Sequence, residues 1–192
     1  SMSEEGIPTA GPIMETLRLR LRPMVMEDAE AMHAFKSDPA ATRLFAQDPQ
    51  TDIEKTRSWI RTGLEGQRDG TSVTWAITLR ESGTVIGECC LSHIDRDSKH
   101  AELGYELLRS YWGRGMMNEA LQAVLGHGFS TMDLNRIEAN PLGINLASQK
   151  VLVRLGFKKE GVLRRRHLHE GEWHDEIWFG LLRSEWDERA RQ

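Results

Sequence analysis

The sequence predicts an α/β fold of mixed α+β type, in which helices pack on both faces of a central mixed sheet. Three leucines and three arginines alternate over residues 17–22, a period of two that predicts a strand with one buried face. Apolar residues recur at spacings of three and four between Met117 and Phe129, which predicts an amphipathic helix. Segments of these two kinds follow one another along 192 residues, a length that suits one domain with a sizeable core.

The N-terminal third is predicted to add two helices to the first strand. Pro23 ends the strand, and helices are expected over residues 27–37 and 52–68, the second with Asp52 as its N-cap. Residues 1–14 are expected to form a flexible tail and residues 15–188 the folded domain.

The remaining elements are predicted from the same patterns and from turn residues. Strands are expected near residues 72–80, 84–94 and 100–108, then a helix, a short strand at 137–140 and a helix over 147–155. Gly156 is placed to end that helix in the left-handed conformation. Two last strands, near 158–169 and 172–183, flank a turn at 170–171. The predicted order is β-α-α-β-β-β-α-β-α-β-β.

Composition excludes several classes of protein. The formal net charge of −4 argues against a dedicated nucleic-acid binder, and no apolar run approaches the roughly 20 residues that a membrane helix needs. The only cysteines, Cys89 and Cys90, are adjacent and imply no disulfide framework. We expect a cytoplasmic protein without a membrane or nucleic-acid partner.

A glycine-containing loop precedes the helix that follows the fourth strand. Gly113 and Gly115 permit close approach of the backbone, and a helix N-terminus presents free N–H groups to an anion such as a pyrophosphate. A plain turn into a helix explains the loop equally well. A Walker A loop is excluded because no Gly-Lys-Ser/Thr tripeptide occurs, and Asn118 stands where a dinucleotide fingerprint needs its third glycine.

The segment from Asn145 to Phe157 has a purely structural explanation as well. Asn145 suits an N-cap, Ser148 can reach back from the third helical position, and Gly156 closes the helix.

Together these segments resemble the GNAT superfamily of N-acetyltransferases. Residues 111–115 followed by Glu119-Ala120-Leu121 resemble its acetyl-CoA loop, and Asn145-x-x-Ser148 running into Leu155-Gly156-Phe157 resembles its second signature. Residues 160–163, 171–175 and 181–186 are similar to the RimJ/RimL-like branch, whose members acetylate the N-termini of ribosomal proteins. The resemblance covers residues 17–186 and implies a single GNAT fold.

The resemblance implies roles for particular residues. The backbone of Tyr105, Glu106 and Leu107 should pair with the pantetheine arm of acetyl-CoA, and Asn145 and Ser148 should approach the pantetheine and the sulfur. Amides for the pyrophosphate should come from Trp112, Gly113, Arg114, Gly115, Met116 and Met117. Trp112 and Met117 depart from the family's usual residues, as does Leu152, where many relatives carry a tyrosine thought to protonate the leaving thiolate.

Transfer of acetyl to an amine requires a neutral amine, a stabilised oxyanion and a leaving thiolate. Glu102 is the first candidate base, although a solvated strand face explains it too. The backbone N–H of Leu107 is the expected oxyanion donor. Ser148 should orient and stabilise the thiolate, because a thiol of pKa about 8.5 is already a fair leaving group.

Three histidines near the C-terminus, His167, His169 and His174, invite a metal interpretation together with Asp175. The resemblance favours no metal, and the histidines are then expected near the acceptor. Arg164-Arg165-Arg166 is expected on the surface of a strand.

We therefore expect an acyltransferase that moves acetyl from acetyl-CoA to a primary amine, with a protein N-terminal α-amine as one acceptor. A polyamine, an amino acid or an aminoglycoside stays open as the acceptor, as does a non-catalytic acyl-CoA-binding module. A homodimer is a possible assembly.

Overall fold

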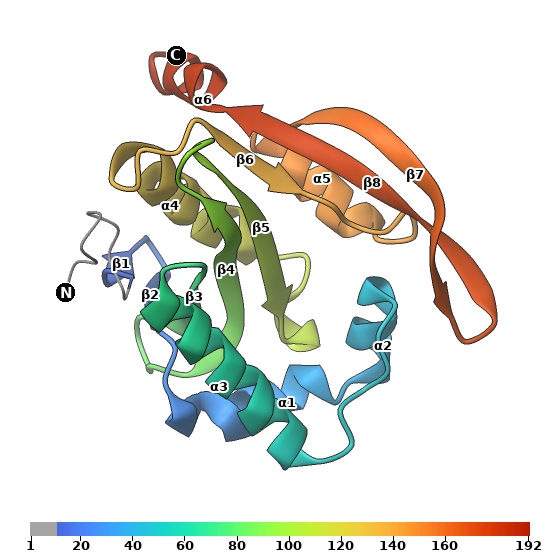
Figure 1. Cartoon of the computed structure of the whole chain (residues 1–192). Coiled ribbons are helices and arrows are strands. Elements are labelled where there is room, and N and C mark those ends of the chain that lie inside the picture. The colour runs from blue at the N-terminus through green and yellow to red at the C-terminus, as the bar shows by residue number, and fades with distance from the viewer. Residues whose placement is uncertain (1–10) are drawn as a thin grey trace.

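A computed structural model describes residues 11–192 and contains one sheet with helices on both sides (Figure 1). The strands are β1 Met14–Glu15, β2 Leu19–Pro23, β3 Val73–Leu79, β4 Val85–Asp95, β5 His100–Leu107, β6 Arg136–Ala139, β7 Lys158–His169 and β8 Glu172–Leu182. The α-helices are α1 Ala29–Lys36, α2 Pro39–Thr42, α3 Ile53–Asp69, α4 Met116–Ser130, α5 Leu146–Arg154 and α6 Arg183–Ala190. Short 3₁₀ turns occur at η1 Met26–Asp28, η2 Arg43–Phe45 and η3 Arg109–Tyr111.

The sheet is mixed, as the sequence predicts. Its strand order is β1-β2-β3-β4-β5-β6-β8-β7. The pair β5–β6 is parallel, and the other neighbouring pairs are antiparallel.

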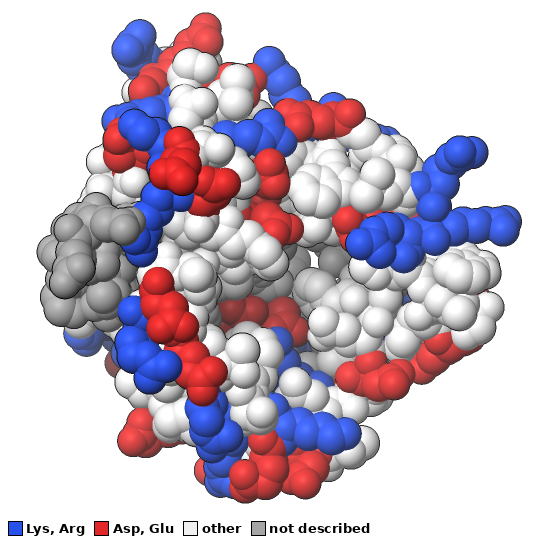
Figure 2. Space-filling model, viewed as in Figure 1, with Lys and Arg blue, Asp and Glu red and all other residues white. Residues whose placement is uncertain are grey.

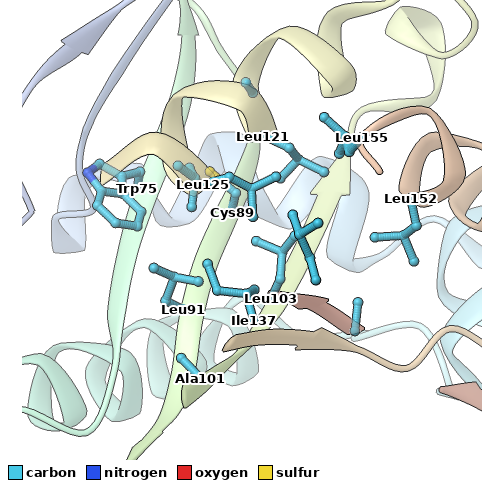
Figure 3. Packing of buried hydrophobic residues seen from close by; sticks show 14 of the residues in the cluster. Trp75, Cys89, Leu91, Ala101, Leu103, Leu121, Leu125, Ile137, Leu152 and Leu155 are labelled. Atoms are coloured by element: carbon cyan, nitrogen blue, oxygen red, sulfur yellow. The ribbon is translucent and has the colours of Figure 1, made fainter. Parts of the chain in front are cut away.

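Successive residues of one strand enter two different cores, which places helices on both faces. On β3, Trp75 and Ile77 join the larger core, while Ala76 between them joins the smaller one with Phe35 and Ile60. Such alternation is the geometry of a strand buried on both sides. Figure 3 shows the larger core, where residues of α4 and α5 meet the β4 and β5 side chains. Helices α1 and α3 cover the opposite face.

The feature that positions the site is a divergence between β5 and β6. The two strands pair only from His100 to Glu102 on β5, against residues 136–138 on β6. Beyond Glu102 they separate, and β8 continues the sheet beside β6 rather than beside β5. Residues 103–107 of β5 therefore have a strand neighbour on one side only, in β4.

Local predictions of helix ends are confirmed. The Asp52 side chain accepts a hydrogen bond from the Glu54 N–H at 2.9 Å, and Gly156, which follows the C-cap residue Leu155 of α5, has a φ of 98°. Helices α2 and α6 and strand β1 were not predicted, because they are too short or too polar to carry a periodic apolar pattern.

The predicted N-terminal tail is partly folded. Residues 1–10 lie outside the described residues, but Met14 pairs with Leu21, and the Pro12 carbonyl accepts a hydrogen bond from the Trp75 indole at 3.0 Å. In residues 11–192 no helix combines the length and apolar character needed to cross a membrane.

Candidate active site

A cavity of about 410 Å³ opens where β5 diverges from β6. Its walls are the end of β5, the loop and first turn of α4, one side of α5 and the α2–η2 segment. A volume of this size is typical of small-molecule sites. Figure 2 shows a hollow at the centre of this face of the molecule, with acidic side chains in its floor.

The open edge of β5 offers backbone groups to the cavity. The Leu108 N–H donates to the Ile86 carbonyl at 2.7 Å, so the neighbouring pair Leu107–Gly87 is one of the pairs that exchange no backbone hydrogen bonds. The N–H and C=O of Leu107 therefore point away from β4, and so do those of Tyr105, two residues earlier. The Trp112 indole donates to the Leu107 carbonyl at 2.7 Å, which leaves the Leu107 N–H directed to the open edge.

The loop between η3 and α4 forms the second wall. Gly113 and Gly115 have φ values of 73° and 75°, a left-handed conformation that glycine adopts without strain. Gly115 is the N-cap of α4, and the amides of the first helical turn have no acceptor within the helix. The positive end of the helix dipole adds to them, so this turn can bind an anionic group at the cavity.

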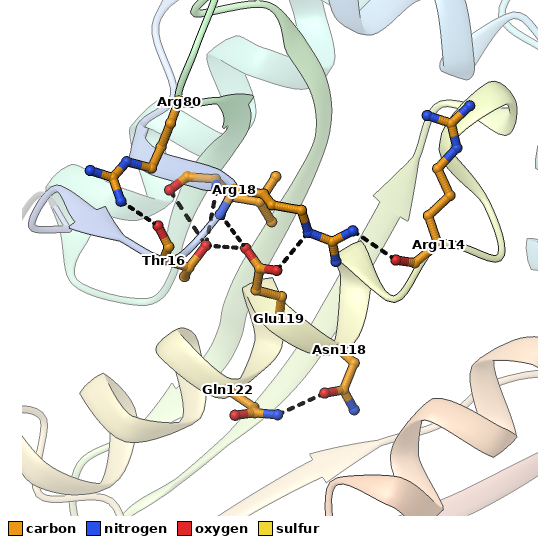
Figure 4. A network of polar contacts seen from close by, with 8 residues as sticks. Thr16, Arg18, Arg80, Arg114, Asn118, Glu119 and Gln122 are labelled. Carbon is orange, nitrogen blue, oxygen red and sulfur yellow. Dashed lines mark hydrogen bonds and ion pairs between the residues drawn. The ribbon is translucent and has the colours of Figure 1, made fainter.

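A polar network holds this loop from the outside (Figure 4). Arg18 on the segment before β2 bonds Glu119 through its side chain at 2.9 Å, and its guanidinium donates to the Arg114 carbonyl at 3.0 Å. Thr16 also bonds Glu119. Burial opposes ionisation of Glu119, but the hydrogen bonds from Thr16 and Arg18 outweigh it and lower the pKa of this carboxyl. An anionic Glu119 thus ties the N-terminal segment to the loop.

Helix α5 brings two of the predicted residues to the cavity. The Asn145 side chain accepts a hydrogen bond from the Ser148 N–H at 3.2 Å, which confirms Asn145 as the N-cap. The Ser148 hydroxyl does not reach back along the helix as expected. It is hydrogen-bonded to the Tyr105 hydroxyl across the gap between α5 and β5.

Glu102 lies at the point of divergence and is not among the residues that line the cavity. One carboxylate oxygen is 2.7 Å from His93 Nδ1, and the other accepts a hydrogen bond from the Asn140 side chain at 3.2 Å. Its side chain is 21% exposed. By strand alternation it shares a face with Glu106, the face opposite to Tyr105 and Leu107.

Glu106 belongs to a buried charged cluster at the cavity's edge. Lys36 on α1 forms an ion pair with Glu106, and its ammonium group lies 3.7 Å from the centre of the Trp59 ring. Glu88 is paired with Glu106 across β4 and β5. Its Oε2 is buried without a hydrogen-bond partner, and burial raises the pKa of Glu88 to about 8.

The three histidines lie in different surroundings. His167 bonds Glu176, which also accepts a hydrogen bond from the Trp178 indole at 2.8 Å. His169 lies 2.9 Å from Asp48, and His174 is buried opposite His167. The metal interpretation that these histidines invited together with Asp175 finds no support, because they are not brought together as a ligand set. Within residues 11–192 the one group with metal-ligand spacing is Asp48, His169 and Glu170, two of them exposed.

Most residues assigned to acetyl-CoA by resemblance line the cavity. They are Tyr105, Glu106, Leu107, Trp112, Gly113, Gly115, Met116, Met117, Asn145 and Ser148. Arg114 is absent from the lining, and its guanidinium lies 5.2 Å from the centre of the Tyr111 ring. Leu152 is fully buried in the core.

Sequence reasoning missed several lining residues. Lys150 and Arg154 stand one helical turn apart on α5, and that spacing beside a predicted anion site was a usable signal. Leu44 and Phe45 close the cavity from η2, a turn with no periodic pattern to reveal it.

Comparisons with known proteins show the family and the fold. A family model described as an acetyltransferase (GNAT) domain matches residues 18–158. An uncharacterized N-acetyltransferase, p20 of Bacillus licheniformis, is 38% identical over 176 residues, covering 90% of this chain and 99% of the relative. The ribosomal protein uS5-alanine N-acetyltransferase of Escherichia coli is 32% identical over 123 residues, covering 64% of this chain and 63% of that protein. Among solved structures, Mycobacterium smegmatis RimJ in complex with a CoA disulfide superposes with a TM-score of 0.78 at 26% identity, over 94% of this chain and 89% of that chain.

Proposed function

The chain belongs to the GNAT family of acetyltransferases and is an acetyl-CoA-dependent acyltransferase, and we propose that it acetylates a protein or peptide N-terminal α-amine. The observation that carries the acetyl-CoA site is the open backbone edge of β5 beside a glycine loop and a helix N-terminus. The α-amine is supported by chemistry and by the relatives.

In this proposal the two ends of acetyl-CoA occupy different parts of the cavity. The pyrophosphate would lie at the first turn of α4, with Lys150 and Arg154 on the facing helix. The pantetheine arm would then follow the open edge of β5 along residues 105–107, with its thioester end within reach of the Leu107 N–H. The thioester would lie deep in the gap between β5 and α5, beside Ser148.

The acceptor would enter from the opposite face of β5. That face carries Glu102 and Glu106, and the hollow seen in Figure 2 opens on this side of the molecule. The amine nitrogen attacks the thioester carbon, and a backbone N–H of β5, that of Leu107 in our assignment, donates to the developing oxyanion. The C–S bond then breaks, and Ser148 donates a hydrogen bond to the departing thiolate. Glu102 takes the amine proton, directly or through water.

An α-amine suits this site better than a polycation. At pH 7 neutralising an α-amine costs about 1.4 kcal/mol, against about 4.6 kcal/mol for a lysine-like amine. The carboxylates near the acceptor side already have partners: Lys36 for Glu106, His93 for Glu102 and His167 for Glu176. A polyamine would have to displace these partners to gain ion pairs. The relative from Escherichia coli is named an alanine N-acetyltransferase of ribosomal protein uS5, which is consistent with a protein acceptor.

The test is a screen of amines that follows release of CoA. Peptides with free N-termini, spermidine, free amino acids and an aminoglycoside are compared at equal concentration. We expect the highest kcat/KM with a peptide N-terminus. A preference for spermidine or the aminoglycoside of tenfold or more would refute the proposed acceptor and leave the acyltransferase assignment intact.

A further inference from the structure

We infer that Tyr105 is a positioning residue, which donates its hydroxyl hydrogen to Ser148 and so directs the Ser148 hydrogen toward the thioester sulfur. This inference rests on the proposed placement of the thioester beside Ser148. In this arrangement a tyrosine acts near the leaving thiolate, but it comes from strand β5. Leu152, the position at which many relatives carry a tyrosine, lies on α5 across the gap.

The first observation is where the two tyrosines of the chain lie. Tyr105 and Tyr111 both line the cavity. Tyr111 faces the Arg114 guanidinium, whereas the Tyr105 hydroxyl reaches across the gap to Ser148. Leu152, in contrast, is fully buried in the larger core and has no polar group to offer.

The second observation is that the Ser148 hydroxyl is not needed to cap helix α5 and is available to bond Tyr105. The N-cap role at α5 is filled by Asn145, whose side chain accepts from the Ser148 N–H. Ser148 is itself 9% exposed, so its hydroxyl must find its partners inside the protein or in the cavity. Tyr105 is the partner that the structure gives it.

The direction of the bond follows from acidity. A phenol is a stronger acid than an aliphatic alcohol, so it is the better donor and the serine oxygen the better acceptor. With Tyr105 as donor, one lone pair of the serine oxygen is occupied and the serine hydrogen turns elsewhere. Because the bond from Tyr105 polarises the serine hydroxyl, the serine becomes a stronger donor to a thiolate.

Tyr105 acts by hydrogen bonding and keeps its proton. Burial raises the pKa of Tyr105 to about 12, although its bond to Ser148 works against the shift. A thiol has a pKa of about 8.5, so proton transfer from this phenol to the thiolate would run uphill. The N–C bond forms, the C–S bond breaks, and the sulfur leaves as a thiolate that takes its proton from water.

The kinetic test is a double-mutant cycle on kcat. Tyr105→Phe removes one hydroxyl, and we expect it to lower kcat about fivefold, the effect of one hydrogen bond, with KM for acetyl-CoA within twofold. Ser148→Ala should lower kcat by less than about a hundredfold, since the thiolate is a fair leaving group. In the Ser148→Ala background Tyr105→Phe should change kcat by less than about twofold, because its partner is gone. Additive losses, or an unchanged kcat in Tyr105→Phe alone, would overturn the inference.

A binding test needs no acceptor and separates this inference from the proposed function. At a pH above the pKa of its thiol, most free CoA is a thiolate. Calorimetry then compares CoA with desulfo-CoA, which lacks the sulfur, in wild type and in both single variants. We expect Tyr105→Phe and Ser148→Ala each to weaken CoA about fivefold and to leave desulfo-CoA unchanged. Equal weakening of both ligands, or of neither, would show that the pair does not act on the sulfur. Ser130→Ala, which removes a hydroxyl at the far end of α4, is the matched control.

Discussion

Glu88 and Glu106 face each other across strands β4 and β5, and both carboxyl groups are buried beneath helix α1. Lys36 bonds Glu106 and leaves Glu88 as the member of the cluster with an unpartnered oxygen. The cluster has one cation for two acids. Burial therefore favours the protonated form of Glu88, and its pKa of about 8 follows from that cause together with the neighbouring Glu106 carboxylate, against the opposing effect of Lys36.

Stability should therefore fall as the pH rises. The pKa of Glu88 is higher in the folded state than its usual 4.5, so the folded state holds a proton that the unfolded state releases. The stabilisation is complete below about pH 4.5 and is lost through about pH 8. We expect Glu88→Gln to flatten this dependence, by on the order of a few kcal/mol between pH 5 and pH 9. Urea unfolding at several pH values in that range measures the free energy of unfolding, with the exposed Glu81→Gln as control. If this free energy depends on pH in the same way in wild type and in Glu88→Gln, the account is contradicted.

Gly115 should be essential for acetyl-CoA binding. A valine at its φ of 75° is strained, and its Cβ would lie 3.6 Å from the Arg18 guanidinium that holds the loop, so the loop and the first turn of α4, where the anion is expected, would have to shift. We expect acetyl-CoA to raise the melting temperature of the wild-type protein and to leave the melting temperature of Gly115→Val unchanged. Gly126→Ala lies within α4 with open space around it, and should keep the ligand-induced shift. A full shift in folded Gly115→Val would place the phosphate site elsewhere.

Arg18 should support the same loop from a distance. Its guanidinium joins Glu119 to the Arg114 carbonyl, so its loss should loosen the loop without touching the thioester. We expect Arg18→Ala to weaken acetyl-CoA binding about three- to tenfold, a modest value because the side chain is 40% exposed. Arg20→Ala removes an exposed arginine from the adjoining strand β2 and is expected to bind as wild type. If calorimetry gives the same acetyl-CoA affinity for Arg18→Ala and Arg20→Ala, Arg18 does not support the loop.

The sequence was informative wherever a local pattern causes the structure. The period of two at Leu19 and Leu21, the N-cap Asp52 and the left-handed Gly156 are local, and each was predicted at its position. The bonds that shape the site are not local. Arg18 to Glu119 spans 101 residues and Tyr105 to Ser148 spans 43, so no spacing along the chain reveals them. The divergence of β5 from β6 is likewise set by tertiary packing and was not predicted; the family resemblance implied only that the backbone of residues 105–107 pairs with the pantetheine arm.

Glu102 is still a predicted base, and the structure sharpens its test. Glu102→Gln keeps the shape of the side chain and its place beside Asn140 but removes the carboxylate. We expect kcat with a peptide N-terminus to fall about ten- to a hundredfold, and to recover in part at higher pH, where more of the amine is already neutral. Glu138→Gln, directly across on β6 and bonded to Arg136, is the control. If the pH–rate profiles of Glu102→Gln and wild type coincide, Glu102 is a strand residue only.

The central claim is that this acetyltransferase selects an α-amine, and one peptide can test it. The peptide carries a free N-terminus and one internal lysine, and the enzyme and acetyl-CoA are supplied at pH 7. Fragmentation by mass spectrometry then locates the acetyl group on the α- or the ε-nitrogen. We predict acetylation of the α-nitrogen in large excess, since its neutral fraction at pH 7 exceeds that of lysine by roughly two decades. Acetyl found mainly on the lysine, or no acetylated peptide from an enzyme that does release CoA with spermidine, would contradict the account.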